Sequence, residues 1–246
     1  MKELNVKAID IGREGTQVFE NGRKLDASVR TLGEMHEVLL SSRFITEDNG
    51  RSPLYYMYRG VGSSDPAFGK HRIRYDITIL ESMDLGGEFN KTLGHYHPLA
   101  EDGLAYPELY EVVEGEALYI LQRRLPNQEY DVVLTRAKAG DKVLMPPNYG
   151  HITVNTGKEL LVMANLVNAD FKSDYKPIEE KHGAAVYAMS DNSLLRNESY
   201  GNVKLPGIGD AERIGYLGKE SIYDQFMANP ALFEFLNRPS LLAGMG

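Results

Sequence analysis

Three histidines and one glutamate have the residue types and the spacing of a divalent metal site. His95 and His97 stand two residues apart, so on a β-strand both imidazoles leave the same face and can reach one ion. Glu108 opens the next strand-like segment, and His151 begins a third one after a turn. Three neutral imidazoles and one carboxylate suit Fe, Mn, Ni, Co or Zn, with coordination positions left for water or substrate.

Each of these residues also has an ordinary explanation, because an isolated HxH pair is usually a chance pattern and a histidine beside a turn is commonly structural. The joint pattern is what indicates one site. Since the chain contains no cysteine, its metal has to be held by His, Asp and Glu. His36 and His182 are predicted surface residues. His71 lies in a basic run, residues 70–74, that is either a solvated loop or a guide for phosphate.

Short strands are predicted to position the four candidate ligands. Tyr, Val, Ile, Leu and Thr are enriched from Arg74 to about Val167, and turn residues interrupt them at intervals of roughly 8–12 residues, which is typical of an all-β sandwich or barrel. The predicted strands cover residues 74–82, 91–97, 108–115, 116–124, 130–137, 141–147, 151–155 and 159–167.

The segment before the barrel contains one helical and one strand-like pattern. Leu32, Met35 and Leu39 repeat at helical spacing and predict a short helix over residues 31–42, followed by a strand over residues 53–60. Clusters of Gly, Pro, Ser and Asp predict loops over residues 60–71, 98–107 and 200–210, the second of them at the barrel mouth.

The C-terminal part is predicted to add an edge strand over residues 184–190 and two short helices. Ser221 with Asp224 has the pattern of a capping box, and Asn229 followed by Pro230 is a second helix-start signal. The predicted buried residues of these helices are Phe226, Leu232, Phe233 and Leu236.

Length and composition limit the classes of protein that the chain can represent. Its 246 residues favour one main domain, residues 1–190 with a barrel core at about 74–167, followed by a C-terminal extension, residues 191–246. A net charge of -8 opposes nucleic-acid binding. No apolar run approaches the roughly 20 residues that span a bilayer, and the first residues do not resemble a signal peptide, so we expect a cytoplasmic protein without a membrane partner.

The candidate ligands resemble the two sequence motifs of the cupin family. His95, His97, Glu108 and Gly115 match the first motif, although the interval before Glu108 is longer than usual. The second motif is matched by Gly140, Pro146, His151 and Asn155, with Asn148 where a glycine is usual. The resemblance implies an all-β cupin fold, a double-stranded β-helix or jelly-roll barrel, with an N-terminal extension and short C-terminal helices. It also implies one divalent metal and, since cupin barrels commonly pair, a homodimer.

Among cupins, the chain is most similar to the cupin-type phosphoglucose isomerases, from residues 28–35 to residues 179–183. The implied reaction interconverts glucose 6-phosphate and fructose 6-phosphate in glycolysis and gluconeogenesis. The resemblance nominates Glu108 and Tyr110 as catalytic residues, and Thr78, Thr92 and Tyr175 as contacts of the hexose phosphate. Thr92 has the opposite strand parity to His95, so it reaches the pocket only if the backbone is irregular there.

Other functions fit the same four ligands. A three-His, one-Glu site can bind iron and activate oxygen, as in a cupin dioxygenase, and a non-catalytic sugar-binding cupin would have the same barrel. Within the isomerase reading, a metal ligand is a weakened base, so a metal-assisted hydride shift stands beside proton transfer by Glu108.

Overall fold

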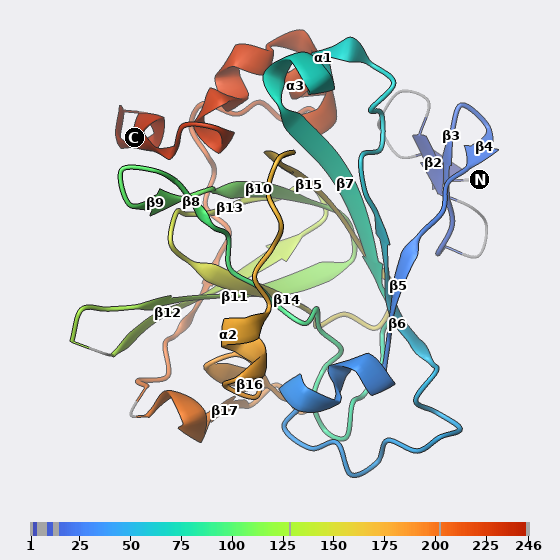
Figure 1. The fold of residues 1–246 in the computed structure, drawn as a ribbon. Helices are drawn as coiled ribbons and strands as arrows, with labels where there is room; N and C mark the ends of the chain where they lie inside the picture. The colour runs from blue at the N-terminus through green and yellow to red at the C-terminus, as the bar shows by residue number, and fades with distance from the viewer. Residues whose placement is uncertain (1, 4–8, 12–14, 128, 202, 245–246) are drawn as a thin grey trace.

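Two facing β-sheets enclose the interior of the molecule. The computed structural model describes residues 2–3, 9–11, 15–127, 129–201 and 203–244. The larger sheet has the strand order β13 (Lys142–Met145), β10 (Glu108–Glu114), β15 (Leu161–Asn168), β7 (Ile73–Leu80), β6 (Pro53–Tyr58) and β5 (Ser28–Thr31). The smaller sheet has the order β14 (Gly150–Asn155), β11 (Glu116–Arg124), β12 (Tyr130–Lys138) and β18 (Ile208–Asp210). The β12–β18 pair is parallel and the other pairs are antiparallel, so the predicted all-β barrel is confirmed (Figure 1).

Smaller elements surround the barrel. An N-terminal sheet contains β1 (Lys2–Glu3), β2 (Ile9–Ile11), β3 (Val18–Glu20) and β4 (Arg23–Lys24), and two hairpins pair β8 (Leu99–Glu101) with β9 (Leu104–Ala105) and β16 (Val186–Ala188) with β17 (Leu194–Arg196). The α-helices are α1 (Pro66–His71), α2 (Lys176–Glu179) and α3 (Ile222–Ala228), and the 3-10 helices are η1 (Gly33–Val38), η2 (Glu198–Tyr200), η3 (Pro230–Leu236) and η4 (Pro239–Gly244). Among the described residues, no helix is long and apolar enough to cross a membrane.

Strand β7 is buried on both of its faces, although polar and apolar residues alternate along its sequence. Tyr75, Ile77 and Ile79 point to the outer side, where they pack with the C-terminal aromatic residues in one apolar cluster. The alternate residues Asp76 and Thr78 point to the barrel interior and line its pocket. The same strand therefore holds the outer cover in place and supplies part of the pocket wall.

The C-terminal helices cover the outer face of the larger sheet. Phe226 in α3 stacks on Phe68 in α1 with 4.8 Å between ring centroids, and α1 and α3 lie together at the top of Figure 1. The side chain of Glu111 in β10 accepts a hydrogen bond from the backbone N–H of Ile222, at 2.8 Å. Residues 191–246, predicted as an extension, thus share a core with the barrel, and the predicted domain boundary stays a prediction.

Two of the predicted loops contain regular structure. Residues 66–71 form α1, because Asp65 caps the helix by accepting a hydrogen bond from the backbone N–H of Ala67 at 2.9 Å and Pro66 occupies its first turn. The Ser, Asp and Pro residues that predicted a loop are therefore a helix start. Residues 98–107 contain the β8–β9 hairpin, and the predicted loop at residues 200–210 ends in β18.

Residues 91–97 were predicted to form a strand, but they do not form a regular one. Among the described residues, this segment makes only isolated bridges, which pair Lys91 with Val154, His95 with His151 and Tyr96 with Asp174. Gly94 interrupts it with φ of +84°, and a Cβ atom at this position would lie 2.4 Å from the side chain of Ile152. The irregular backbone lets the segment cross close to β14.

The predicted helix signals were mostly accurate. Residues 33–38 form a 3-10 helix inside the predicted helix over residues 31–42. The hydroxyl of Ser221 accepts a hydrogen bond from the backbone N–H of Asp224 at 3.0 Å, which confirms this cap. The second helix-start signal is also confirmed, because η3 begins at Pro230 with Asn229 as its N-cap, although the Asn229 side chain makes no capping hydrogen bond. Phe226, Phe233 and Leu236 are buried as predicted, whereas Leu232 is half-buried.

We expect Phe226→Ala to lower the free energy of unfolding by about 3–5 kcal/mol, because it leaves a cavity between the C-terminal helices and the outer face of β7. Denaturant titration followed by circular dichroism measures the change. Leu241→Ala, at a residue that is 37% exposed, is the matched control and should change the free energy by no more than about 0.5 kcal/mol. Equal effects of the two substitutions would mean that the C-terminal helices do not stabilise the barrel.

Candidate active site

The four predicted metal ligands come from three segments that meet inside the barrel. His95 and His97 lie on the irregular segment after Gly94, Glu108 is the first residue of β10, and His151 is the second residue of β14. The backbones of His95 and His151 exchange two hydrogen bonds, at 3.3 and 3.1 Å. This pairing brings segments more than fifty residues apart into register.

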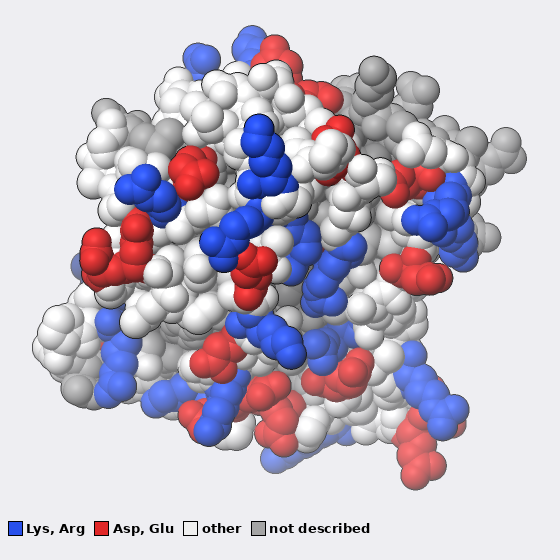
Figure 2. Space-filling model, turned by 45° about the horizontal axis from the view of Figure 1, so that its top comes forward, with Lys and Arg blue, Asp and Glu red and all other residues white. Residues whose placement is uncertain are grey.

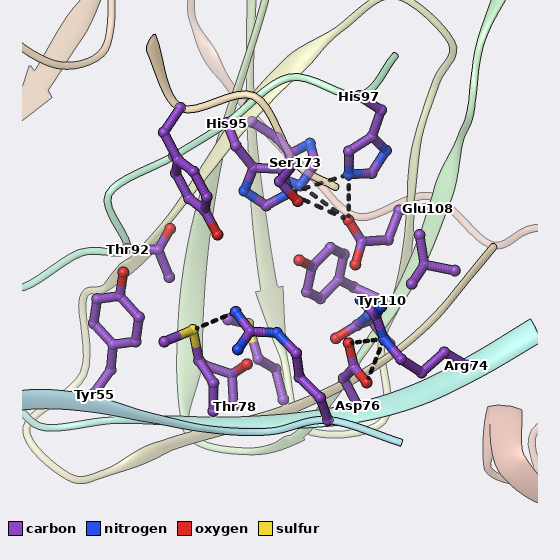
Figure 3. Close-up of a pocket in the computed structure, with 18 of the residues that line it drawn as sticks. Tyr55, Arg74, Asp76, Thr78, Thr92, His95, His97, Glu108, Tyr110 and Ser173 are labelled. Carbon is purple, nitrogen blue, oxygen red and sulfur yellow. Dashed lines mark hydrogen bonds and ion pairs between the residues drawn. The ribbon is translucent and has the colours of Figure 1, made fainter. Parts of the chain in front are cut away.

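The ligand atoms of these four residues converge on one point. The Oε2 atom of Glu108 lies 3.1 Å from Nε2 of His151, 3.3 Å from Nε2 of His97 and 3.9 Å from Nε2 of His95, as the dashed lines in Figure 3 show in part. All four ligand atoms lie within 4.8 Å of one another. Two atoms bound about 2.1 Å from one ion, at right angles, are themselves about 3 Å apart. The spacing therefore fits a shared ion.

Buried polar atoms without partners support the same interpretation. Although Oε2 of Glu108 and Nε2 of His151 are close, neither has a hydrogen-bond partner among the described residues, and both are buried. Such atoms cost free energy unless a partner is bound between them. A divalent ion would satisfy both, so the residues fit the predicted cofactor.

The orientation of His97 is set by a backbone carbonyl. Its Nδ1 atom lies 2.9 Å from the carbonyl oxygen of Tyr106. Because a carbonyl can only accept a hydrogen bond, Nδ1 carries the proton and the Nε2 lone pair faces Glu108. The ring of Phe171 packs against His97 at 4.4 Å and stacks on Tyr106 at 5.0 Å, which holds the imidazole in place.

Burial and mutual contact favour neutral imidazoles at His95 and His151 and an ionised carboxylate at Glu108. Burial lowers the pKa of His95 well below its usual range, with His151 and His97 adding to the effect. Burial also lowers the pKa of His151, although Glu108 opposes the shift. Burial by itself would raise the pKa of Glu108, but the contacts with His151 and His97 outweigh it and hold the pKa well below its usual range. These are the protonation states that bind a metal.

The pocket beside the four ligands has a polar wall formed by three strands. Tyr110 in β10 pairs with Asn165 in β15, and Asn165 pairs with Asp76 in β7, so the three side chains form one row. Burial and the nearby Glu108 carboxylate raise the pKa of Tyr110 well above its usual range, so its hydroxyl stays protonated. The residues lining the pocket include Tyr55, Met57, Arg59, Arg74, Asp76, Thr78, Thr92, Tyr110, Asn165, Val167, Phe171, Ser173 and Tyr175.

All of the predicted substrate contacts lie at this pocket. Thr78 faces the pocket from β7. Thr92 also lines it, because the backbone there is irregular, which is the condition that the sequence analysis set for this residue. The Thr92 hydroxyl also accepts a hydrogen bond from the backbone N–H of Thr153, at 3.0 Å. Tyr175 packs against His95 with ring centroids 5.5 Å apart. Figure 3 shows Thr92 and Tyr55 on the opposite side of the pocket from Arg74, with Thr78 between them at the lower edge of the view.

Sequence reasoning missed several polar residues of the pocket, chiefly Arg74, Asp76 and Asn165. A signal for two of them was present, because Arg74 and Asp76 alternate with Thr78 and so share its inward face. Arg74 belongs to the basic run at residues 70–74, which is therefore only partly a surface feature. His36 and His182 are exposed, as predicted.

Comparison with known proteins places this architecture in a family. Residues 29–204 match the family model described as glucose-6-phosphate isomerase (GPI). The glucose-6-phosphate isomerase of Pyrococcus abyssi is 31% identical over 182 residues, which cover 74% of this chain and 88% of that protein. The enzyme of the same name from Thermococcus onnurineus is 27% identical over 166 residues, covering 68% of this chain and 80% of that protein.

Solved structures with a similar fold include an oxalate oxidase in complex with the substrate analogue glycolate. It is 12% identical, with a TM-score of 0.38 over 65% of this chain and 63% of that one, a level that carries no functional information. The barrel topology and the family match confirm the predicted all-β cupin fold and the predicted isomerase class. Because the match spans well over half of its residues, the chain belongs to the glucose-6-phosphate isomerase family.

Proposed function

We propose that this chain interconverts glucose 6-phosphate and fructose 6-phosphate in the pocket beside His95, His97, Glu108 and His151, with a divalent metal as cofactor. The observation that carries the proposal is the convergence of these four ligand atoms next to a wall of hydroxyl and cationic side chains, in a member of the isomerase family. That polar wall favours a sugar phosphate over the small substrate of a dioxygenase. The predicted homodimer stays a prediction.

His95, His97, Glu108 and His151 would hold the metal. Bound there, Fe, Mn, Ni, Co or Zn would supply Lewis-acid stabilisation of the negative charge that develops on the substrate oxygens at C1 and C2. The protein supplies neutral imidazoles, an ionised carboxylate and a buried environment, and Tyr106 fixes the lone pair of His97 toward the site.

The polar groups of the pocket indicate how the substrate lies. Thr78, Thr92 and Tyr55 offer hydroxyl groups at the side away from Arg74, and Arg59 also lines the pocket. We place the phosphate at the three hydroxyls, which leaves C1 and C2 at the metal ligands. Lys and Arg side chains gather along the middle of the face in Figure 2, among acidic groups, so a local attraction for phosphate is compatible with the net charge of -8.

Our candidates for the hydrogen transfer are Glu108 and Tyr110. The isomerisation removes a proton from C2 of the aldose and returns one to C1, and Glu108 is the carboxylate at that end of the pocket. Because its Oε2 faces the imidazoles, Oε1 is the oxygen left for proton transfer. Tyr110 keeps its proton, so its hydroxyl can donate a hydrogen bond to a substrate oxygen as charge develops there.

Metal removal should abolish turnover. We expect chelation of the purified protein to lower kcat for fructose 6-phosphate, measured in a coupled assay, by at least about 100-fold, and Mn or Fe to restore it. Glu108→Gln should lower kcat by at least about 100-fold even with metal added, because the amide neither accepts the proton nor carries the charge. Undiminished turnover after complete metal removal, verified by elemental analysis, would rule out a metal-dependent reaction.

The metal-free protein should lose stability as the pH falls. The folded-state pKa values of His95 and His151 lie below that of a free imidazole, so the unfolded chain binds more protons and stability decreases below about pH 6.5. The slope is at most about 1.4 kcal/mol per pH unit for each imidazole. Glu108 acts in the same direction, but only below about pH 4.5.

Urea titrations of chelated protein between pH 5 and 8 measure this slope. His95→Gln should reduce it by removing one titrating group, whereas His36→Gln, at an exposed surface position, is the matched control and should leave it unchanged. A wild-type stability that is flat or rises toward pH 5 would contradict the assignment of neutral imidazoles.

Loss of the hydroxyl groups should weaken substrate binding more than chemistry. We expect Thr78→Val and Thr92→Val each to raise KM for glucose 6-phosphate about tenfold, with kcat changed less than about threefold, because each variant loses a hydrogen bond to a charged phosphate. Steady-state kinetics measure both constants. Thr135→Val, on β12 outside the pocket, is the control, and an equal effect there would show that the hydroxyls act only through the fold.

A further inference from the structure

An ion pair stands inside the barrel on the pocket side of β7. The Nε atom of Arg74 donates to both carboxylate oxygens of Asp76, at 2.9 and 2.8 Å, and the backbone N–H of Gly60 donates to Oδ1 at 2.8 Å. The Asp76 side chain is only 9% exposed and that of Arg74 27%. The three hydrogen bonds fix the carboxylate in one orientation.

Barrel stability does not require a charged pair at this position. A buried ion pair contributes little net stability, because desolvation offsets the attraction, and apolar residues of similar size often serve as well. Both side chains line the pocket, and neither takes part in the metal or phosphate contacts assigned above. Among the described residues, only Nε of Arg74 makes hydrogen bonds, so its two Nη groups have donors available for a ligand.

The position of the pair relative to the other two polar sites is set by strand geometry. Thr78, at the phosphate end, is two residues from Asp76 on the same face of β7, which corresponds to roughly 6.6 Å along the strand. Arg74 lies in register with Val167, and Val167 with Glu108, so Arg74 is at the level of the metal ligands and Asp76 lies between that level and Thr78. In Figure 3 the Arg74–Asp76 pair lies below Glu108 and opposite Thr92.

If the phosphate lies at the three hydroxyls and C1 and C2 lie at the metal ligands, the middle of the sugar's carbon chain lies beside this pair. Resting on the function proposed above, we propose that Asp76 and Arg74 bind the hydroxyl groups at C3 and C4 of the sugar and select the configuration at C4. Asp76 accepts a hydrogen bond from one hydroxyl, and the free Nη groups of Arg74 donate to its neighbour. Because β7 and the Gly60 bond hold the pair rigid, the epimer with one hydroxyl reversed cannot make both contacts.

Binding of two unreactive polyol phosphates tests the proposal. Sorbitol 6-phosphate and galactitol 6-phosphate differ only in the configuration at C4 and have no carbonyl group to isomerise. Calorimetric titration of the full chain with Mn²⁺ present should show at least about tenfold tighter binding of sorbitol 6-phosphate by the wild type. In Asp76→Ala the two affinities should agree within about twofold, mainly through weaker binding of sorbitol 6-phosphate, while inorganic phosphate binds as in the wild type.

Controls separate selectivity from damage to the fold. The ratio of two affinities is measured on one preparation, so partial misfolding cancels. Arg74→Gln keeps the Gly60 bond to Asp76 and should reduce the preference as well, which provides a second variant if Asp76→Ala does not fold. Asp131→Ala removes the half-exposed Arg123–Asp131 pair, away from the pocket, and should keep the full preference.

Two results would overturn the proposal: equal affinity of the wild type for the two epimers, or an unchanged preference in Asp76→Ala and Arg74→Gln. Isomerase activity is assayed separately with glucose 6-phosphate. A C4 preference that depends on Asp76 in a protein without isomerase activity would refute the proposed function and leave the sugar site standing. Activity without that preference would refute the sugar site alone.

Discussion

The burial of the Glu108 carboxylate among three imidazoles is the constraint that organises the interior of this protein. A buried charge without a partner is strongly unfavourable, and the His97 imidazole, whose Nδ1 proton is directed to the Tyr106 carbonyl, offers no hydrogen bond from Nε2 to offset that cost. A cation shared by all four ligands removes the conflict. The buried atoms left without hydrogen bonds, the lowered pKa values of His95 and His151 and the carbonyl that orients His97 all belong to this one arrangement.

The pocket wall and the outer cover depend on the same strand. Since successive side chains of β7 point to opposite faces, Arg74, Asp76 and Thr78 line the pocket while Tyr75, Ile77 and Ile79 pack under the C-terminal helices. Burial on both sides excludes water from the outer face and holds the strand rigid. A rigid wall is what a site needs if it is to distinguish sugars by the direction of one hydroxyl.

The irregular backbone of residues 91–97 determines where two residues of the site lie. Residues 91–97 do not continue a sheet, and the left-handed conformation of Gly94 lets them approach β14 closely enough for His95 to pair with His151. The same departure from a regular strand brings Thr92 to the pocket. A strict strand would have sent the Thr92 and His95 side chains to opposite faces, so both the place of Thr92 at the pocket and the place of His95 in the ligand cluster depend on this segment.

The sequence alone was enough to predict the four candidate ligands, the strand-rich barrel and the family, because motif spacing and the turn residues between apolar strands are local properties of the chain. It also indicated Ser221 as a helix cap. The folded chain was needed to show that the C-terminal helices close the outer face of β7, because packing between distant segments leaves no local signal in the sequence. Local signals did exist for the other two differences. Arg74 and Asp76 alternate with Thr78, and Asp65 before Pro66 is a helix-start pattern, but the first signal was not used and the second was interpreted as a loop.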